Sequence, residues 1–423
     1  MQNLERPHNT DRPHSKEPRP LRVLHFISEP RSWHFFDGQP EFLRRLGWEF
    51  IGVSSPGPLL EQFADANRVS VYPVKVVRDL SFWSDIVSLV RLCQVLRRAR
   101  PDILHAHFSK PGIIGMIAGF VSRVPVRIYH NHGMALSSAR GRRRLLLWAV
   151  ERLSCTLAHR VIYVAPSVLR DAIGMRVCDP RKAEVIFSAN GLDSSTRFAR
   201  QLFAPGSREQ ERRRLHIPND AFVVGFVGRI LNIKGIDELV RAWELLSPTE
   251  PRLHLLFVGE SDPRAPISAR AESVMHSASK IHLAGFIEDP AVAYLAMDVV
   301  ALPSYHEGLG YSLLEAAAME LPVIGTRIPG IVDAVLDGTT GILVNPGDPD
   351  ELAAAILTYM HYPCLAETHG RAGRDFVVGS FQRSDVWERI RHLYSQLMSE
   401  RKPRRRFVAD RSQVGTVPGD LQP

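Results

Sequence analysis

Residues 302–341 read LPSYHEGLGYSLLEAAAMELPVIGTRIPGIVDAVLDGTTG. A short apolar strand ends near Pro303, and a loop with Gly308 and Gly310 follows it. The run LLEAAAME is then a strong helix former. The next apolar run, Pro322–Thr326, indicates another strand. A strand, a loop, a helix and a second strand in this order are typical of a βαβ unit, which predicts a parallel sheet.

The same alternation of short apolar runs with helical patterns extends along the chain from Leu21. In the first half, strands are expected at Leu21–Ser28, Phe50–Ser54, Val69–Val74, Asp102–His105, Val126–Tyr129 and Arg160–Val164. In the second half, they are expected at Phe222–Gly228, Leu253–Gly259, Ile281–Gly285, Val299–Pro303, Pro322–Thr326 and Gly341–Val344. We therefore predict an α/β protein with two doubly wound, Rossmann-like domains that face each other across a cleft, where such folds bind ligands.

The length of 423 residues suits two domains. Residues 195–220 interrupt the alternation with Arg, Gln, Glu and two prolines, so a linker is expected there. The predicted organisation is a disordered arm (1–20), an N-terminal domain (21–200), a linker (201–218), a second domain (219–380), a C-terminal helix that returns to the first domain (381–400) and a disordered basic tail (401–423).

The composition is that of an ordinary globular protein, with 45% hydrophobic and 23% charged residues. The first 20 residues lack an apolar segment, so we do not expect a signal peptide. The longest apolar run, Ile113–Val121, is shorter than the roughly 20 residues that span a bilayer. The four cysteines form no CxxC pair and are interpreted as small core residues in a reducing compartment. A cytoplasmic protein is expected.

The net charge of +8 is unevenly distributed. Between Arg91 and Arg160, 13 basic residues face only Asp102 and Glu151. This excess indicates either an anionic partner, such as a lipid, a polyprenyl phosphate or a nucleotide, or simply a solvated basic face.

One helix in the basic stretch leaves the same choice open. The helix expected at Arg142–Ala158 begins with three arginines and has Leu146, Val150, Leu153 and Leu157 as its expected core face. It either dips into an anionic membrane or packs within the first domain.

Several motifs of other enzyme classes are missing from the sequence. The first strand is followed by EPRSWHFFDG rather than GxGxxG, and GxxxxGK[ST] does not occur, which argues against a dinucleotide-dependent dehydrogenase and a P-loop nucleotidase. The pairs His105-Ala-His107 and His130-Asn-His132 have no accompanying HExxH motif or cysteine cluster. We interpret them as strand-end histidines that line the cleft and expect no metal site.

The loop at 307–310 and the following helix suit a diphosphate, because the helix N-terminus directs free N–H groups and a positive dipole end at the ligand. Arg229 and Lys234, in the stretch GRILNIKG, supply positive charges that would replace a metal ion. Glu307 and Glu315 flank this position and would accept hydrogen bonds from hydroxyl groups. Hydroxyl groups on both sides of a diphosphate describe a sugar nucleotide.

Taken together, these residues resemble the retaining glycosyltransferases of the GT-B fold (family 4, or group 1), whose donor domain carries a GR…KG element and a Glu-x7-Glu motif. The resemblance implies that Arg229 and Lys234 bind the diphosphate, that Glu315 holds the ribose, and that Glu307 contacts the transferred sugar. It also assigns the backbone of Gly308, Leu309 and Gly310 to donor binding. His132, at the family's HG position, is expected near the donor sugar and is added to the catalytic candidates.

In the N-terminal half, the stretches DILHAHFSKPGIIGMIAG, VRIYHNHG and ANGLD resemble bacterial enzymes that build capsule, exopolysaccharide and lipid-linked oligosaccharides. The resemblance places four residues on the acceptor side, namely Gly38, His107, Lys110 and Asn190. Many relatives have paired glycines after the first strand, whereas this chain has only Gly38, beside Trp33, Phe35 and Phe36. Such an aromatic loop would suit an apolar or sugar-stacking acceptor.

The function predicted in this way is transfer of a hexose, with retention, from a UDP-linked donor to a saccharide or a polyprenyl-diphosphate-linked saccharide in polysaccharide biosynthesis. The resemblance implies no cofactor, and we expect a location in the cytoplasm, on the inner face of the membrane. A sugar-nucleotide 2-epimerase on the same fold is the first alternative. A scaffold that binds lipid or nucleic acid is the second, and the intact set of glutamates and cations argues against it, so no nucleic-acid partner is expected.

Overall fold

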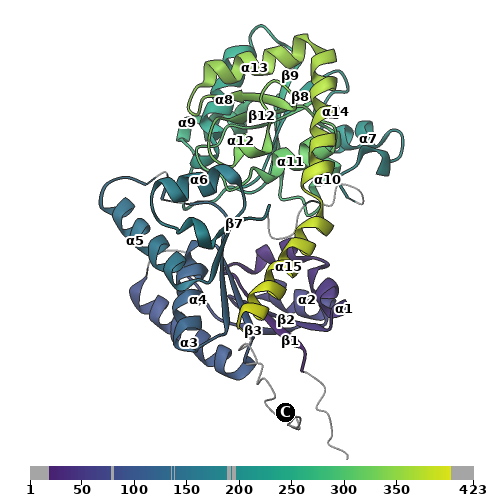
Figure 1. The fold of residues 1–423 in the computed structure, drawn as a ribbon. Coiled ribbons are helices and arrows are strands. Elements are labelled where there is room, and N and C mark those ends of the chain that lie inside the picture. Colours follow the sequence, from purple (N-terminus) through teal and green to yellow (C-terminus); the bar gives the residue numbers. More distant parts are fainter. Residues whose placement is uncertain are drawn as a thin grey trace, which may run out of the picture.

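The computed structural model describes residues 19–77, 81–134, 136–137, 139–187, 192 and 197–401. These residues form two α/β lobes, the N lobe below and the C lobe above in Figure 1. The N-lobe sheet has the strand order β3-β2-β1-β4-β5-β6-β7, and the C-lobe sheet has the order β10-β9-β8-β11-β12-β13. Every strand pair in both sheets is parallel. The predicted pair of doubly wound domains is confirmed.

The strands are β1 (Leu21–Phe26), β2 (Trp48–Ser54), β3 (Ser70–Pro73), β4 (Ile103–His107), β5 (Val126–Asn131), β6 (Arg160–Tyr163), β7 (Ala183–Val185), β8 (Phe222–Val227), β9 (Leu253–Val258), β10 (Ile281–Gly285), β11 (Val299–Leu302), β12 (Val323–Thr326) and β13 (Gly341–Val344). The strand β7 was not predicted. Its three residues are only partly buried at the edge of the sheet, so they carry too weak an apolar pattern.

The α-helices are α1 (Gln39–Arg45), α2 (Pro58–Asn67), α3 (Phe82–Ala99), α4 (Ser109–Val121), α5 (Gly141–Leu157), α6 (Pro166–Gly174), α7 (Ser207–Arg214), α8 (Ile236–Leu246), α9 (Ala269–Ser277), α10 (Pro290–Leu295), α11 (Tyr311–Ala318), α12 (Ile331–Ala334), α13 (Pro349–His361), α14 (Pro363–Ser380) and α15 (Arg383–Arg401). Short 3-10 helices lie at η1 (Pro30–Phe36), η2 (Pro180–Lys182), η3 (Arg200–Leu202) and η4 (Asn232–Lys234).

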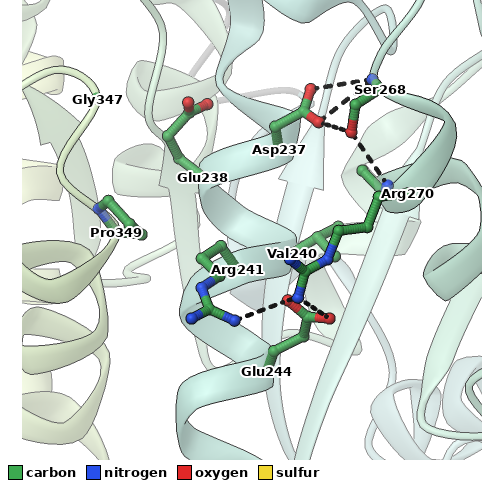
Figure 2. Close-up of a pocket in the computed structure, with 10 residues that line it drawn as sticks. Asp237, Glu238, Val240, Arg241, Glu244, Ser268, Arg270, Gly347 and Pro349 are labelled. Atoms are coloured by element: carbon green, nitrogen blue, oxygen red, sulfur yellow. Dashed lines mark hydrogen bonds and ion pairs between the residues drawn. The ribbon is translucent and has the colours of Figure 1, made fainter.

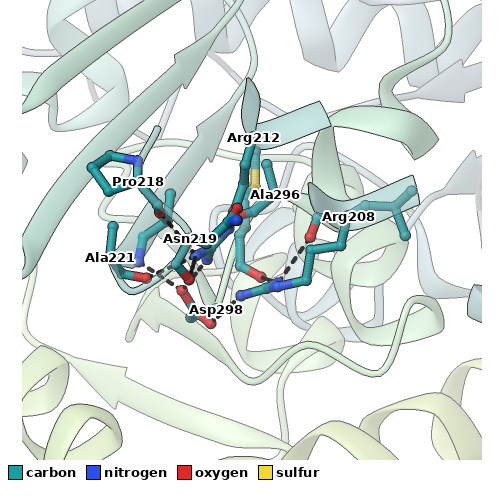
Figure 3. Close-up of polar contacts among 10 residues, drawn as sticks. Arg208, Arg212, Pro218, Asn219, Ala221, Ala296 and Asp298 are labelled. Atoms are coloured by element: carbon teal, nitrogen blue, oxygen red, sulfur yellow. Dashed lines mark hydrogen bonds and ion pairs between the residues drawn. The ribbon is translucent and has the colours of Figure 1, made fainter. Parts of the chain in front are cut away.

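The segment 201–218, expected as a linker, contains helix α7, which is fastened to the C lobe by Arg212 (Figure 3). The Arg212 side chain is 1% exposed, and its Nη2 donates to Asp298 Oδ2 at 2.8 Å. Its other N–H groups donate to four backbone carbonyl oxygens, those of Pro218, Asn219, Ala221 and Ala296. The segment therefore belongs to the packed C lobe.

Helix α15 crosses back to the N lobe, where Figure 1 shows it lying over the sheet. Its apolar face is buried in one cluster with N-lobe strand residues such as Val23 and Ile103. The members of α15 in this cluster are Val386, Ile390, Leu393, Tyr394 and Leu397. The helix spacing of these residues explains why they share one face.

The prediction for the face of α5 was wrong. Leu146 and Leu153 are exposed by 49% and 44%, while the buried residues of this helix are Glu151, Ser154 and Cys155. The hydroxyl and carboxyl groups of Ser154 and Glu151 are buried because each makes hydrogen bonds, which a count of apolar positions cannot detect.

Three of the four cysteines lie in the core, as expected, but Cys364 is exposed. Within the described ranges, no helix combines the length and the apolar character that crossing a bilayer requires.

The anchor of α7 allows a matched test of stability. Replacing Arg212 with Ala should lower the free energy of unfolding by about 3–5 kcal/mol, because four backbone carbonyl oxygens and Asp298 lose the donor that this buried side chain supplies. Arg208 also donates to Asp298, at 2.6 Å, but its side chain is 29% exposed, so water can replace it. Arg208→Ala should therefore cost only about 1 kcal/mol. Urea denaturation measures both losses, and equal losses would contradict this account.

Candidate active site

The loop between β11 and α11 carries several of the residues that the sequence predicts for donor binding. Gly310 has φ = 63° and forms the N-cap of α11. Because glycine has no side chain, no side-chain cap bonds to the first N–H groups of the helix. Leu309 is 5% exposed and fixes the loop by packing into the core. The loop thus presents backbone donors and the carboxylate of Glu307 at the end of the C-lobe sheet.

Lys234 and Glu307 lie 73 positions apart in the chain and form an ion pair through Nζ and Oε1. Ser304 Oγ donates to the same carboxylate oxygen at 2.9 Å. The two charged side chains are only 19% and 12% exposed. Gly235 makes this approach possible, because a Cβ there would lie 2.0 Å from the carbonyl oxygen of Pro303. Its φ of 72° is also one that glycine adopts without strain.

Arg229 follows β8 and has a different partner. Its Nη1 lies 3.3 Å from Asp262 Oδ2, and its side chain is 50% exposed. Arg264 donates to the same carboxylate at 2.7 Å. The hydrogen bonds from Arg264, followed by the charge of Arg229, hold the pKa of Asp262 well below its ordinary value. Arg229 therefore keeps a screened positive charge that a second anion can share.

Glu315 lies in the second turn of α11 and is half-buried. The hydroxyl of Tyr294 donates to its Oε2 at 2.8 Å and lies 3.2 Å from the carbonyl oxygen of Ser312. Burial raises the pKa of Glu315 to about 7, although the Tyr294 hydrogen bond acts in the opposite direction. Ionisation of this carboxyl group is therefore unfavourable in the folded protein, and such a raised pKa is typical of functional carboxyl groups.

The two lobes meet at this loop through backbone atoms. A Cβ on Gly308 would lie 2.2 Å from the carbonyl oxygen of His132, and a Cβ on Gly133 would lie 3.2 Å from Gly308 Cα. Gly330, with φ = 88°, approaches from the other side, where a Cβ would lie 2.5 Å from the Gly308 carbonyl oxygen. The predicted residues Glu307, Gly308 and His132 are therefore brought together at the junction of the lobes.

A second contact joins the lobes beside the first one. The backbone N–H of Ser167, at the start of α6, donates to Asp333 Oδ2 at 2.9 Å, and the Ser167 hydroxyl bonds to the same oxygen. The N–H of Gly330 donates to Ser167 Oγ at 2.7 Å. This contact holds Gly330 against the donor loop.

Sequence reasoning missed the residue that orders the N-lobe side of the junction. Glu151 is 3% exposed and accepts hydrogen bonds from Ser109 (2.6 Å) and Tyr129 (2.8 Å). The Asn131 amide lies 3.3 Å from Glu151 and, through its Oδ1, accepts from the Gly133 N–H at 2.9 Å. The sequence offered one signal for this role, since Glu151 is the only glutamate among 13 basic residues. A carboxylate that is buried in such a stretch must be paired or hydrogen-bonded.

The predicted acceptor-side residues do not gather around the donor loop. Gly38 packs against helix α15, where a Cβ would meet the Trp387 ring at 2.7 Å. Lys110 pairs with Asp85 at 2.8 Å, and the two side chains are 15% and 27% exposed. His107 is buried but contacts His132. Asn190 lies outside the described residues.

The expected aromatic acceptor loop is wrong for two of its three residues. Trp33 and Phe36 are each 2% exposed and belong to the N-lobe core. The Trp33 indole N–H donates to Ser54 Oγ at 3.0 Å. Only Phe35 reaches the junction, with its ring edge-on to Tyr311 at a centroid distance of 5.8 Å.

The paired histidines do not line an open surface as expected. His105, His107 and His130 are at most 1% exposed. Together with His25 and His132 they form two groups whose ring nitrogens lie close enough for one metal ion, His25–His105–His107 and His107–His130–His132. Neither group includes a carboxylate to offset the charge of a buried dication.

A hollow of about 300 Å³ opens elsewhere on the C lobe, along α8 (Figure 2). Asp237 and Glu244 line it; Asp237 accepts from Ser268, and Glu244 accepts from Arg270 and Arg241. It contains none of the predicted donor residues, and its lining has three carboxylates against two arginines, so it does not suit an anion. The candidate site is therefore the junction at Glu307 and not this hollow.

Comparison with known proteins agrees with the geometry of the junction. Residues 221–361 match the model of "Glycosyl transferases group 1", and residues 41–188 match that of "Glycosyl transferase 4-like domain". The capsular polysaccharide biosynthesis glycosyltransferase CapM of Staphylococcus aureus is 30% identical over 379 residues, which cover 90% of this chain and 98% of that protein. The chain belongs to the group 1 glycosyltransferases.

A second relative agrees with this assignment, and solved structures share the fold. UDP-Gal:alpha-D-GlcNAc-diphosphoundecaprenol alpha-1,3-galactosyltransferase of Escherichia coli is 26% identical, over 81% of this chain and 87% of that protein. Anabaena HepE, solved with UDP-glucose, has a TM-score of 0.73 at 19% identity, with 89% of this chain and 100% of that chain covered. Sucrose-phosphate synthase of Thermosynechococcus elongatus has a TM-score of 0.73 at 22% identity, with coverages of 90% and 100%. The glycosyltransferase therefore has the predicted GT-B fold.

The raised pKa of Glu315 makes a prediction about stability. In the folded state this carboxyl group holds its proton up to about pH 7, while in the unfolded chain it releases it near pH 4.5. Between these values the unfolded state binds fewer protons, so stability falls as the pH rises. At pH 8 Glu315→Gln should be more stable than wild type by on the order of 2–3 kcal/mol, and at pH 4.5 the two should be equal. Thermal unfolding across this range measures the difference, and a pH-independent difference would contradict it.

Proposed function

We propose that this glycosyltransferase moves a hexose from a UDP-linked donor to a hydroxyl group of a saccharide carried on a polyprenyl diphosphate, with retention of configuration. The bond between the sugar's C1 and the diphosphate oxygen breaks, and a bond from C1 to the acceptor oxygen forms on the same face. The acceptor's hydroxyl proton passes to the departing diphosphate. The products are UDP and the extended saccharide.

The observation that carries this proposal is the largely buried Lys234–Glu307 pair beside the N-terminus of α11, which has no side-chain cap. A diphosphate bound there would offer Lys234 a partner of higher charge than one carboxylate, while the helix N–H groups receive the phosphate oxygens. Glu307 would then accept hydrogen bonds from the transferred sugar. Arg229 and Lys234 would stabilise the charge that develops on the leaving group, so no metal cofactor is required.

Glu315 suits the ribose of the same donor. It lies within α11, beyond the phosphate-binding turn, and its Oε2 already accepts a hydroxyl hydrogen bond from Tyr294. A carboxylate with a raised pKa gains most from additional donors, because each hydroxyl that binds it offsets part of the cost of burial. The vicinal ribose hydroxyls are such donors.

Retention is supported by the way Glu307 is held. Double displacement needs a free carboxylate about 5 Å from a partner acid. The Oε1 of Glu307 instead accepts a hydrogen bond from Ser304, which does not depend on Lys234 and lowers the nucleophilicity of the carboxylate. Same-face attack, assisted by the leaving diphosphate, needs no such nucleophile.

The names of relatives support the choice of donor and acceptor. CapM is named for capsular polysaccharide biosynthesis, and the Escherichia coli relative for a galactose transfer from UDP to a diphosphoundecaprenol-linked sugar. The HepE structures contain UDP, UDP with glucose, or UDP-glucose. These names favour transfer over 2-epimerisation, and incubation with UDP-sugar alone tests the choice, because an epimerase would form the epimer without an acceptor.

Replacing either cation tests the roles in leaving-group stabilisation. Lys234→Ala and Arg229→Ala should each lower kcat at saturating donor by about a hundredfold and weaken UDP binding far less, since the charge develops in the transition state. The matched control is Arg241→Ala, which removes a half-exposed cation from the outer part of α8 and should leave both quantities unchanged. An equal loss of kcat and UDP affinity would argue against the transition-state role.

Two N-lobe helices suit a membrane-borne acceptor. Helix α3 exposes Phe82 by 72% and Trp83 by 76%, and α5 begins with three exposed arginines followed by Leu145, exposed by 68%. Both helices pack against α4. Exposed aromatic and aliphatic side chains next to arginines are typical of surfaces that enter an anionic lipid interface. We propose that these helix starts dock on the membrane that holds the acceptor.

The proposed membrane surface has a direct test with vesicles. Phe82→Ser combined with Trp83→Ser should reduce sedimentation with vesicles of phosphatidylglycerol and phosphatidylcholine by at least about tenfold, because two aromatic side chains that would insert into the lipid are lost. Tyr362, on the C lobe, is 63% exposed, so Tyr362→Ser serves as the control and should not reduce binding. If the double variant binds as wild type does, this surface is not the membrane contact.

A further inference from the structure

The buried histidines of the N lobe form an ordered row across three neighbouring strands. His25 on β1 pairs in register with His105 on β4, and His107 on β4 pairs with His130 on β5. His132 follows just after β5. Valine and isoleucine residues at alternate positions on these strands share the same face of the sheet, which α15 covers. Hydrogen bonds offset the cost of burial for some of these rings, whereas neither ring nitrogen of His130 has a partner among the described residues.

Three of these rings are joined end to end. His25 Nδ1 lies 3.1 Å from His107 Nε2, and His107 Nδ1 lies 3.2 Å from His132 Nε2. This series of hydrogen-bonded histidines leads from the interior of the sheet to the junction of the lobes, because the backbone carbonyl of His132 contacts Gly308. His107 uses both of its ring nitrogens in this chain.

All three rings are neutral at physiological pH. Burial lowers the pKa of His25 and of His132 to about 3, and it holds the pKa of His107 well below its ordinary value. A neutral imidazole has one N–H and one nitrogen lone pair. His107 must therefore donate to one neighbour and accept from the other, and the chain has only two arrangements.

The far end of the chain decides between these arrangements. His25 Nε2 is buried and has no hydrogen-bond partner among the described residues. If His132 donates to His107 and His107 donates to His25, this nitrogen carries a buried N–H without an acceptor. If His25 donates to His107 and His107 donates to His132, the same nitrogen carries only a lone pair. Unpaired N–H groups are rarer in proteins than unpaired acceptors, so the second direction is favoured.

We propose that His25 and His107 are positioning residues that hold His132 as the Nδ1–H tautomer, so that it presents a hydrogen-bond donor to an oxygen atom of the bound sugar nucleotide. Nδ1 is the free nitrogen of a half-buried ring, with no partner among the described residues. The identity of the ligand rests on the proposed function, but the tautomer does not. His132 takes no proton from the reaction, and its role is to orient an oxygen.

The same nitrogens could instead hold a metal ion, since the two groups of three histidines allow one. A bound metal ion would replace the hydrogen bonds between the histidine rings, because each metal ligand must direct its lone pair at the ion. Hydrogen bonds explain the observed pairs without a buried charge, and the metal is kept as an outcome of the test.

Nitrogen-15 NMR of histidine-labelled protein without ligand tests the tautomer. We expect His132 to show a protonated Nδ1 and an unprotonated Nε2. In His107→Asn the side-chain amide should take the place of Nδ1–H as a donor and keep this tautomer. In His107→Asp a carboxylate should accept from Nε2–H and reverse it. His105→Leu is the control, because His105 is equally buried but bonds to Tyr394. It should leave His132 unchanged.

Turnover and metal content complete the test. With UDP-glucose as the first donor assayed, His107→Asp should lower kcat at least about tenfold, whereas His107→Asn should stay within about threefold, because only the donor direction differs. A purely structural role of His107 predicts equal losses in both variants and would overturn the proposal. So would an Nε2–H tautomer in wild type, or one equivalent of bound metal in the purified protein. If no donor supports transfer, the proposed function fails while the NMR result still decides the tautomer.

Discussion

The structure depends on a contact in which two loops touch through their backbones. Gly308 of the C lobe lies against the carbonyl group of His132, with a separation that leaves no room for a Cβ atom. Any side chain there would push the lobes apart. Because the loop that carries Glu307 also begins α11, this one contact sets the distance from the helix N-terminus to the N lobe. The Ser167–Asp333–Gly330 hydrogen bonds maintain it from the other side.

The charged groups around this contact are costly for the fold. Glu315 and Glu151 are carboxyl groups whose pKa values are raised by burial, and Lys234 and Glu307 are largely removed from water. Each has a specific partner, but apolar side chains of similar size would stabilise such positions at least as well. The proposed sugar-nucleotide donor would explain this loss of stability, because an anionic, hydroxyl-rich ligand needs charged and hydrogen-bonding groups at a fixed place. Glu151 instead orders the backbone that meets Gly308.

The fold and the placement of Glu307 at the junction of the lobes could be predicted from the sequence, because both depend on local patterns, while the donor-binding roles stay predictions. Apolar runs and a glycine loop before LLEAAAME were enough to predict the β11–α11 unit and the position of Glu307. What failed depended on the tertiary environment. Trp33 and Phe36 are core residues because η1 folds under the sheet, and Leu146 is exposed because paired polar groups occupy the buried face of α5. Position 190 lies outside the described residues, so its assignment stays a prediction.

Helix α15 connects these observations. It follows α14 of the C lobe in the chain, yet its apolar face lies on the N-lobe sheet, directly over the histidine row. Tyr394 of this helix bonds to His105 Nδ1 at 2.6 Å, and His105 stacks on His107 at a centroid distance of 4.2 Å. Removing α15 would admit water to the row and restore ordinary histidine pKa values, because burial is what lowers them. The chain segment that ties the two lobes together is therefore the same one that keeps the His25–His107–His132 chain neutral and directional.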